Sequence, residues 1–179
     1  MTVKEESLKL TPRQREGRAI NAVAELLRRT LSVPHIHLEP PASLLRADVL
    51  AVDRGGAGDL HAVEIDLFEE KRMLGPVARR LEIIRSAHRQ LMSMSAHFRY
   101  LAVSVENFEM LHGELSNLGL YAEDGIGRLG IVTMAEKGAA SPVAAISLAP
   151  ERFRMDPAKL KAIETRLLAK SRPDIEVAI

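Results

Sequence analysis

The segment that most constrains the fold runs from residue 46 to residue 71, RADVLAVDRGGAGDLHAVEIDLFEEK. Two apolar runs flank a glycine-rich stretch, a pattern that indicates a β-hairpin. The runs also contain three acidic residues, Asp48, Glu64 and Asp66. Removing a carboxylate from water costs free energy unless a cation, a metal ion or a hydrogen bond compensates. The hairpin is therefore where a functional site is expected.

The glycine-rich turn fixes how the two strands of the hairpin pair. A loop between Asp53 and Asp59 makes these two residues a pair across the hairpin. Asp48 then falls opposite Glu64, and directly opposed side chains have Cβ atoms about 4.5–5.5 Å apart. Asp66 lies two residues beyond Glu64 and shares its strand face. This register predicts that the three carboxylates cluster, whereas a slip of one residue would separate Asp48 from the other two.

The second strand of the hairpin is apolar on both faces. Val63, Ile65 and Leu67 alternate with Glu64 on one side, and the acidic face also carries Ala62. Such a strand is typical of the centre of a sheet that has helices on each side. We therefore expect the acidic cluster to be partly buried.

The composition narrows the class of protein. A chain of 179 residues fits one domain with a sizeable core. Aromatic residues make up only 3%, which argues against proteins that stack single-stranded bases on aromatic side chains. The absence of cysteine excludes disulfides and thiolate chemistry. The first ten residues, MTVKEESLKL, lack an apolar signal region, so we expect a cytoplasmic protein with no membrane partner.

The net charge of +1 hides an uneven distribution along the chain. Residues 71–99 contain seven Lys or Arg and one acid, and residues 12–30 contain five Arg and two acids. Residues 59–70 contain five acids and no Lys or Arg. An acidic pocket between basic helices fits a polyanion held beside a divalent cation. The alternative, favoured for charged stretches alone, is that these are ordinary solvated helix faces.

Apolar spacing and capping residues predict a mixed sheet flanked by helices. Thr11 and Pro12 suit the start of a first helix that ends near Thr30. Further helices are expected over 73–96, 107–118 and, after Asp156, 157–170, and strands over 35–38, 46–53, 60–68, 99–105, 119–122, 128–134 and 143–148. We expect a flexible leader over residues 1–11, a core domain over 12–135, and a C-terminal extension over 136–179 that packs on the core and ends in a frayed tail.

This order of elements resembles the restriction-endonuclease-like superfamily, the PD-(D/E)XK nucleases. Ala47–Asp48 stands where these proteins usually have Pro–Asp, and Glu64–Ile65–Asp66 stands where they have acid–x–Lys. The run GRLGIVTM, residues 127–134, resembles the strand that often completes such domains. The resemblance covers roughly residues 12–135. It implies an α/β fold with an αβββαβ core, followed here by a helical extension.

The resemblance also implies a function, that of a metal-dependent nuclease-like domain that acts on or binds DNA. Asp48 and Glu64 would hold Mg²⁺ or Mn²⁺, which needs only one or two protein carboxylates. Asp66 would be a third catalytic residue or a degenerate position. The metal would lower the pKa of a bound water and stabilise charge on the phosphate. The basic helix would contact phosphates through Arg79, Arg80, Arg85 and Arg89.

The sequence departs from the family pattern in two places. Asp66 occupies the position of the family lysine, which reverses the charge, and Asn21 stands where many members have a glutamate on the first helix. Glu25, one helical turn further on, shares that face. Candidates for the missing positive charge are Lys71, Arg80, Arg85 and Arg89. The departures make a catalytically inactive domain of the same fold, which binds nucleic acid or protein, the main alternative. A third hypothesis is a structural or interaction protein such as a homodimer.

Overall fold

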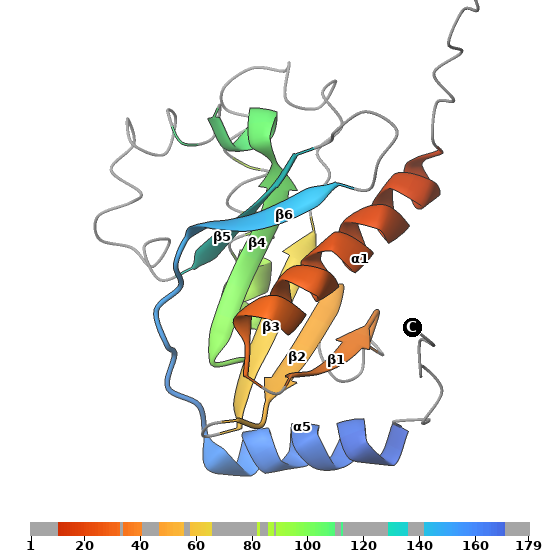
Figure 1. Ribbon diagram of the computed structural model, residues 1–179. Helices are drawn as coiled ribbons and strands as arrows, with labels where there is room; N and C mark the ends of the chain where they lie inside the picture. Colours follow the sequence, from red (N-terminus) through yellow and green to blue (C-terminus); the bar gives the residue numbers. More distant parts are fainter. Residues whose placement is uncertain are drawn as a thin grey trace, which may run out of the picture.

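The computed structural model describes residues 11–32, 34–40, 47–55, 58–65, 82, 86–87, 89–109, 112, 129–135 and 142–170 (Figure 1). Six strands form one sheet, and helices flank it. The predicted mixed α/β class is therefore confirmed. Within the described residues, no helix has the length and apolar character needed to cross a membrane.

The helices and strands follow one another in the expected order. They are α1 (Pro12–Thr30), β1 (Pro34–Leu38), β2 (Val49–Asp53), β3 (Asp59–Ile65), β4 (Phe98–Ser104), β5 (Gly130–Ala135), β6 (Val143–Leu148) and α5 (Pro157–Lys170). Residues 89–93 and 105–109 are also helical. The predicted strand over 119–122 and the first part of the predicted long helix, residues 73–81, lie outside the described residues.

Helix α1 begins where its capping residues predict. The Thr11 hydroxyl accepts a hydrogen bond from the backbone N–H of Gln14, and the Gln14 side chain accepts one from the N–H of Thr11. This reciprocal pair is a capping box, and Pro12 takes the first helical position. The helix therefore starts at a defined residue, which fixes where its first turns lie relative to the sheet.

The strand order in the sheet repeats the order of the chain, from β1 to β6. The β1–β2, β2–β3 and β5–β6 pairs are antiparallel, whereas β3–β4 and β4–β5 are parallel. In the β2–β3 hairpin, Asp53 pairs with Asp59, which is the predicted register. Strand β3 lies between β2 and β4, so its predicted central position is also confirmed.

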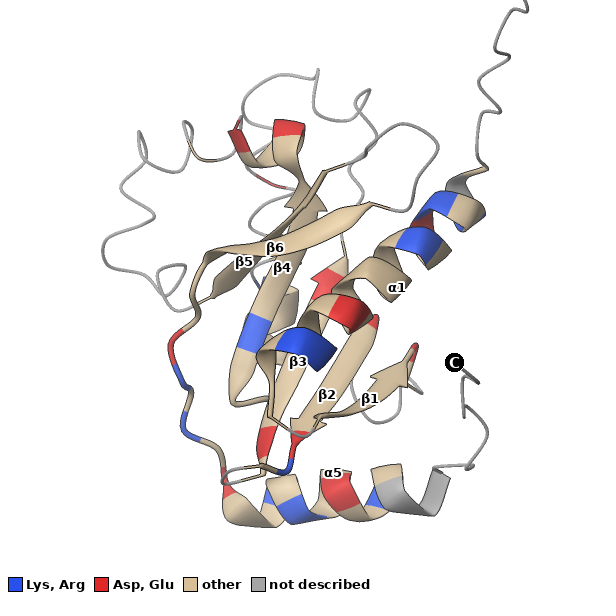
Figure 2. Ribbon diagram, viewed as in Figure 1, with Lys and Arg blue, Asp and Glu red and all other residues tan. Residues whose placement is uncertain are grey.

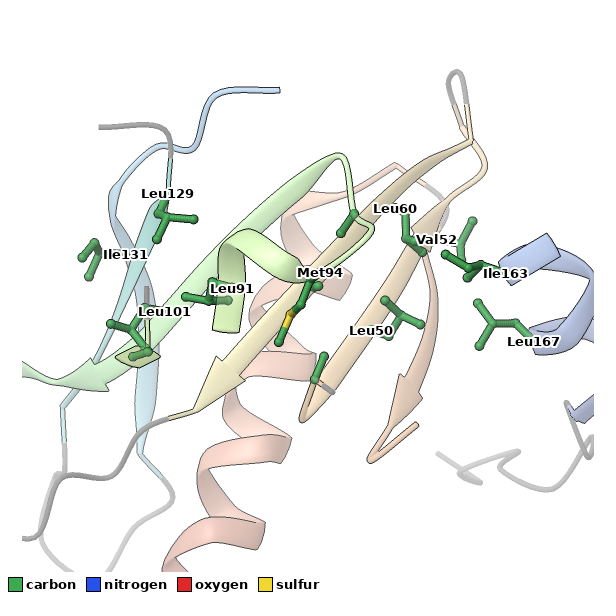
Figure 3. Close-up of a cluster of buried hydrophobic side chains, with 14 of the residues drawn as sticks. Leu50, Val52, Leu60, Leu91, Met94, Leu101, Leu129, Ile131, Ile163 and Leu167 are labelled. Carbon is green, nitrogen blue, oxygen red and sulfur yellow. The ribbon is translucent and has the colours of Figure 1, made fainter. Parts of the chain in front are cut away.

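Apolar side chains cover both faces of the sheet. On one face α1 buries Val23 and Leu27 against residues such as Val49 and Val63. On the other face the helical segment 89–93 and α5 pack against the strands (Figure 3), and the buried residues there include Leu50, Leu60, Leu91, Met94, Ile163 and Leu167. Burial on both faces explains the continuous apolar runs of β2 and β3.

Two predicted helix boundaries are wrong. The helix expected to continue to residue 96 ends at Ser93, because the N–H of Met94 turns back to the carbonyl of Leu91, three residues earlier (3.1 Å). The next helix begins after Ser104 and not at Asn107. The Ser104 hydroxyl accepts the N–H of Asn107 (3.1 Å), which makes Ser104 the cap and places Asn107, which is buried, in the first turn.

The segment between β6 and α5 is fixed to the beginnings of β3 and β4. Arg152 donates to one carboxylate oxygen of Asp59 from Nη2 (2.7 Å) and from Nε (3.1 Å). The N–H of Phe153 donates to the carbonyl of His97 (2.8 Å), and the Arg99 guanidinium lies 3.9 Å from the centre of the Phe153 ring. These contacts hold α5 against the turn end of the β2–β3 hairpin (Figure 1).

Candidate functional site

Three acidic residues lie at one end of the first three strands. Because β1, β2 and β3 are antiparallel neighbours, the end of β1, the start of β2 and the end of β3 meet at the same end of the sheet. Glu39, Asp48 and Glu64 occupy these positions. Acidic segments gather there, opposite the end covered by α5 (Figure 2). We call these three residues the acidic end.

The backbone at Asp48 departs from a regular strand. Its N–H donates to the carbonyl of Val63 (3.0 Å), while its carbonyl accepts from the N–H of Glu39 (2.7 Å). In a regular antiparallel ladder both groups of one residue point to the same neighbour. The ladder is therefore irregular here, and β2 begins at Val49 and not at residue 46 as expected. Glu39 itself has a φ of 45°, in the left-handed region that favours glycine.

The side chain of Asp48 is tied to β3. Its Oδ2 accepts a 2.6 Å hydrogen bond from the backbone N–H of Ile65, the residue directly after Glu64. The carboxylate is partly buried, and this burial raises its pKa. The hydrogen bond from Ile65 lowers that pKa, but the charges of Glu16 and Glu39 raise it again. Among the residues that the structure describes, every charged side chain that shifts this pKa is therefore itself acidic.

Glu64 is held from a different direction. Its Oε1 accepts a 2.7 Å hydrogen bond from the side-chain amide of Gln90, which lies in the helical segment before β4. The last paired residues of the hairpin at this end are Val49 and Val63, and the N–H of Asp48 also donates to the carbonyl of Val63, so the regular pairing that would set Asp48 opposite Glu64 stops here. A neighbouring backbone group and a neighbouring helix thus each fix one carboxylate of the pair.

Most of the other predicted site residues lie outside the described residues. These are Asp66, Lys71, Arg79, Arg80 and Arg85. Arg89 is described, and its Nη2 lies 2.9 Å from Oε1 of Glu82 in an exposed ion pair, which contributes little to stability. Among the described residues, no group of three or more His, Cys, Asp or Glu side chains is placed to hold a metal ion. A metal at the acidic end would therefore rely on two described carboxylates and on water.

The acidic residue that α1 presents to this end is Glu16. Glu25, the expected substitute for the family glutamate, instead pairs with Arg28 (3.6 Å) and Arg29 (3.7 Å) on its own helix. Asn21 is exposed. Reasoning from sequence missed Glu16 and Gln90, because the packing of the helices against the sheet decides which helical turn reaches this end of the sheet. It also missed Glu39, which directly follows β1.

A buried polar pair under α1 has a structural role. Nδ1 of His61 lies 3.2 Å from the hydroxyl of Tyr100, and the His61 ring stacks on Phe98 with centroids 4.7 Å apart. Burial lowers the pKa of His61 to about 4 and raises that of Tyr100 to about 12. Both groups are neutral at pH 7, so neither changes its protonation state readily there.

Comparison with known proteins adds a fold but no activity. No family model and no curated protein matches the chain. The structure is similar to that of the SPO1766 protein of unknown function from Silicibacter pomeroyi, with a TM-score of 0.51 and 18% sequence identity. The match covers 90% of this chain and 87% of that one. Because likeness at this identity shows only the fold, function has to be argued from the residues of the acidic end.

Proposed function

We propose that this chain is a PD-(D/E)XK-like domain that binds one divalent cation, Mg²⁺ or Mn²⁺, through Asp48 and Glu64, and acts there on DNA. The observation that supports it is the electrostatic environment of Asp48. The carboxylate is partly buried, and the charged side chains of the described residues that shift its pKa, Glu16 and Glu39, are acidic. No Lys or Arg among the described residues forms an ion pair with it.

A divalent cation offsets this unfavourable arrangement. Burial and two like charges all disfavour the ionised form of Asp48. A bound cation reverses the sign of the local field and favours that form. Mg²⁺ is satisfied by one or two carboxylates because it retains several waters. The pair Asp48 and Glu64 is therefore a sufficient set of protein ligands.

The hydrogen bonds at the acidic end prepare the two carboxylates for this role. The N–H of Ile65 engages Oδ2 of Asp48, and a carboxylate has acceptor capacity on its second oxygen. Gln90 fixes the direction of the Glu64 side chain. When bound, the cation supplies an acidified water and stabilises charge on a phosphate. The residues of this chain contribute orientation, which reduces the entropy lost on binding.

A second candidate function is DNA binding without hydrolysis. It is favoured by Asp66, which stands where the resemblance implies a lysine. An acid in that position can contribute a ligand oxygen but cannot donate positive charge to a phosphate. Both candidates share the metal site and differ only in whether a phosphodiester bond is broken.

The first experiment measures metal binding by isothermal titration calorimetry with MgCl₂ and with MnCl₂. The wild-type chain should give heat for one site, and Asp48→Asn and Glu64→Gln should abolish it. Glu25→Gln, which removes an acid from the outer face of α1, is the matched control and should bind as wild type does. Wild-type protein that binds neither metal would overturn the proposal.

The second experiment separates the two candidate functions. Labelled duplex DNA is incubated with each variant in the presence of the metal that binds. Cleavage that disappears in Asp48→Asn and Glu64→Gln supports a nuclease, whereas metal binding without cleavage by any variant supports the binding domain. Cleavage that persists unchanged in both variants would show that the acidic end is not the active site.

A further inference from the structure

We propose that His35 and His37 on β1 form a two-histidine chelate for Zn²⁺ or a similar divalent transition-metal ion. This inference goes beyond the proposed function. The acidic end takes a hard cation on carboxylate oxygens, whereas this site takes a borderline cation on imidazole nitrogens. No step of it depends on Asp48 or Glu64, so an experiment can reject either site while the other holds.

Strand geometry brings the two histidines to one face of the sheet. They are separated by Ile36, and side chains two residues apart on a strand share a face. Ile36 packs against the buried cluster that contains α1, so the histidines lie on the other face. The register agrees, because His35 is opposite Val52 and His37 is opposite Leu50, and both partners belong to the cluster of that other face.

The two imidazole rings lie within reach of a single metal ion. Their centroids are 6.4 Å apart, and their planes differ by 22°. A Zn–N bond is about 2.1 Å, so two nitrogens bound to one ion are separated by up to roughly 4 Å. The χ2 torsion of histidine has broad minima, so ring rotation brings one nitrogen of each ring to that separation. The backbone of β1 does not have to move.

The ring nitrogens of this pair differ from those of the buried histidines. Nδ1 of His61 lies 3.2 Å from a tyrosine hydroxyl, and Nδ1 of His97 accepts a backbone N–H (2.9 Å). Those two rings are held by structural contacts. Within the described part of the chain, neither His35 nor His37 forms a hydrogen bond or an ion pair through its ring. The lone pairs that a metal ion needs are therefore not engaged by any of these residues.

The place of β1 in the sheet gives an ion access to the pair. Among the described strands, β1 has a neighbour on one side only, which is β2 (Figure 1). The side chain of His35 is exposed and that of His37 is half-buried. All 5 residues of β1 pair with β2, which holds the backbone in place. Ligands on a fixed backbone lose little conformational entropy when they bind.

The chemistry of the pair selects the class of ion. Neutral imidazole is a good ligand for Zn²⁺, Cu²⁺ and Ni²⁺, whereas Mg²⁺ prefers oxygen. Water fills the coordination positions that the protein leaves open. Once one imidazole has bound, binding of the second is intramolecular and strengthens the complex without a new partner. The affinity should therefore depend on both rings together.

The test is isothermal titration calorimetry of the full chain with ZnCl₂ at pH 8, where histidine side chains are mostly neutral. His35→Asn and His37→Asn should each weaken Zn²⁺ binding by about tenfold or more, and the double variant should lose little beyond either single variant. Two controls should bind as wild type does. His112→Asn removes an exposed histidine elsewhere in the chain, and Asp48→Asn removes a carboxylate of the acidic end.

A second measurement does not rely on any substitution. Zn²⁺ added to ¹⁵N-labelled wild-type protein should shift the ring nitrogen resonances of two histidines together, with the same dependence on metal concentration. Shifts of a single ring, or of none, would overturn the chelate.

The remaining outcomes of the calorimetry each decide the inference. Wild-type protein that binds no Zn²⁺ overturns it, as do single variants that keep the wild-type affinity. An equal loss in His112→Asn would indicate general binding to surface histidines, and a loss in Asp48→Asn would place the ion at the acidic end; both overturn it. Titration of His35→Asn/His37→Asn with MgCl₂ should match the wild type, so failure here is distinguishable from failure of the proposed function.

Discussion

The side chain of Asp48 accepts the backbone N–H of Ile65 across the end of the β2–β3 hairpin, at 2.6 Å. At this point the ladder is irregular, and the carboxylate takes the place that a backbone carbonyl has in a regular pair. Asp48 therefore both accepts a backbone N–H at the end of the sheet and places a negative charge there. The first prediction concerns substitutions that remove one of these contributions without the other.

Asp48→Asn should stabilise the fold, and Asp48→Ala should destabilise it. The raised pKa of Asp48 means that the native state disfavours the charged form, so removing the charge at pH 7 should raise the free energy of unfolding. Asparagine retains an acceptor for the N–H of Ile65. Alanine leaves that N–H without its acceptor, at a cost of about 1–3 kcal/mol. Urea denaturation in EDTA measures both, and equal destabilisation by the two variants would contradict the prediction.

Added metal should stabilise the wild-type chain but not Asp48→Asn. A ligand that binds only the native state adds about 2.7 kcal/mol at a concentration one hundred times its Kd. Thermal unfolding with and without MgCl₂ measures the shift, and excess EDTA should reverse it. Glu25→Gln serves as the control and should retain the full shift. An equal rise of Tm in Asp48→Asn would place the metal elsewhere.

Gln90 should act as a positioning residue for Glu64. Replacing it with leucine keeps the size of the side chain but removes the 2.7 Å hydrogen bond to Oε1 of Glu64. Loss of such a supporting contact typically weakens metal binding by about 10–100-fold. Calorimetry should therefore show a larger Kd for Gln90→Leu with one site still present. An unchanged Kd, with the fold intact by circular dichroism, would remove Gln90 from the site.

The contribution of His61 to the stability of the fold should fall as the pH drops from about 6.5 toward 4. Burial lowers the pKa of His61 from 6.5 to about 4, so the unfolded chain takes up a proton in this range before the native state does. Proton uptake by the unfolded state favours unfolding, by up to roughly 3 kcal/mol for this shift. His97, whose pKa burial also lowers, adds to the fall in the same direction.

A variant whose side chain at position 61 does not titrate tests the contribution of His61 to the pH dependence of stability. Denaturant unfolding is measured at several pH values for wild type and His61→Gln. The variant should be less stable at pH 7, since it loses a buried ring and its stacking on Phe98. Its stability should nevertheless depend less steeply on pH. A variant with the wild-type pH dependence would show that His61 is not the titrating group.

Local signals predicted much of this fold from the sequence. Thr11 and Pro12 marked the start of α1, and the glycine-rich turn set the pairing of Asp53 with Asp59. Asp156, whose carboxylate accepts the N–H of Ala158 (2.9 Å), marked the start of α5. Each of these features depends on residues close together in the chain, which is why sequence patterns report them.

The composition of the acidic end was less predictable. The hydrogen bond of Gln90 to Glu64 and the influence of Glu16 on Asp48 both depend on how helices pack against the sheet. No local pattern specifies that packing, and the sequence pointed to Glu25 in place of Glu16. The boundary at Ser104 was missed because its hydroxyl caps a helix that the apolar spacing placed two residues later. Metal binding and nuclease activity stay predictions.

The agreement between strand order and chain order shapes how the molecule folds. Strands β1 to β3 are joined by short connections. The parallel pairs β3–β4 and β4–β5 need longer crossover connections, so we expect them to form later. We expect the first three strands to form an early nucleus. Asp48 and Glu64, the proposed metal ligands, would then take their places at the end of the hairpin before the later strands have joined the sheet.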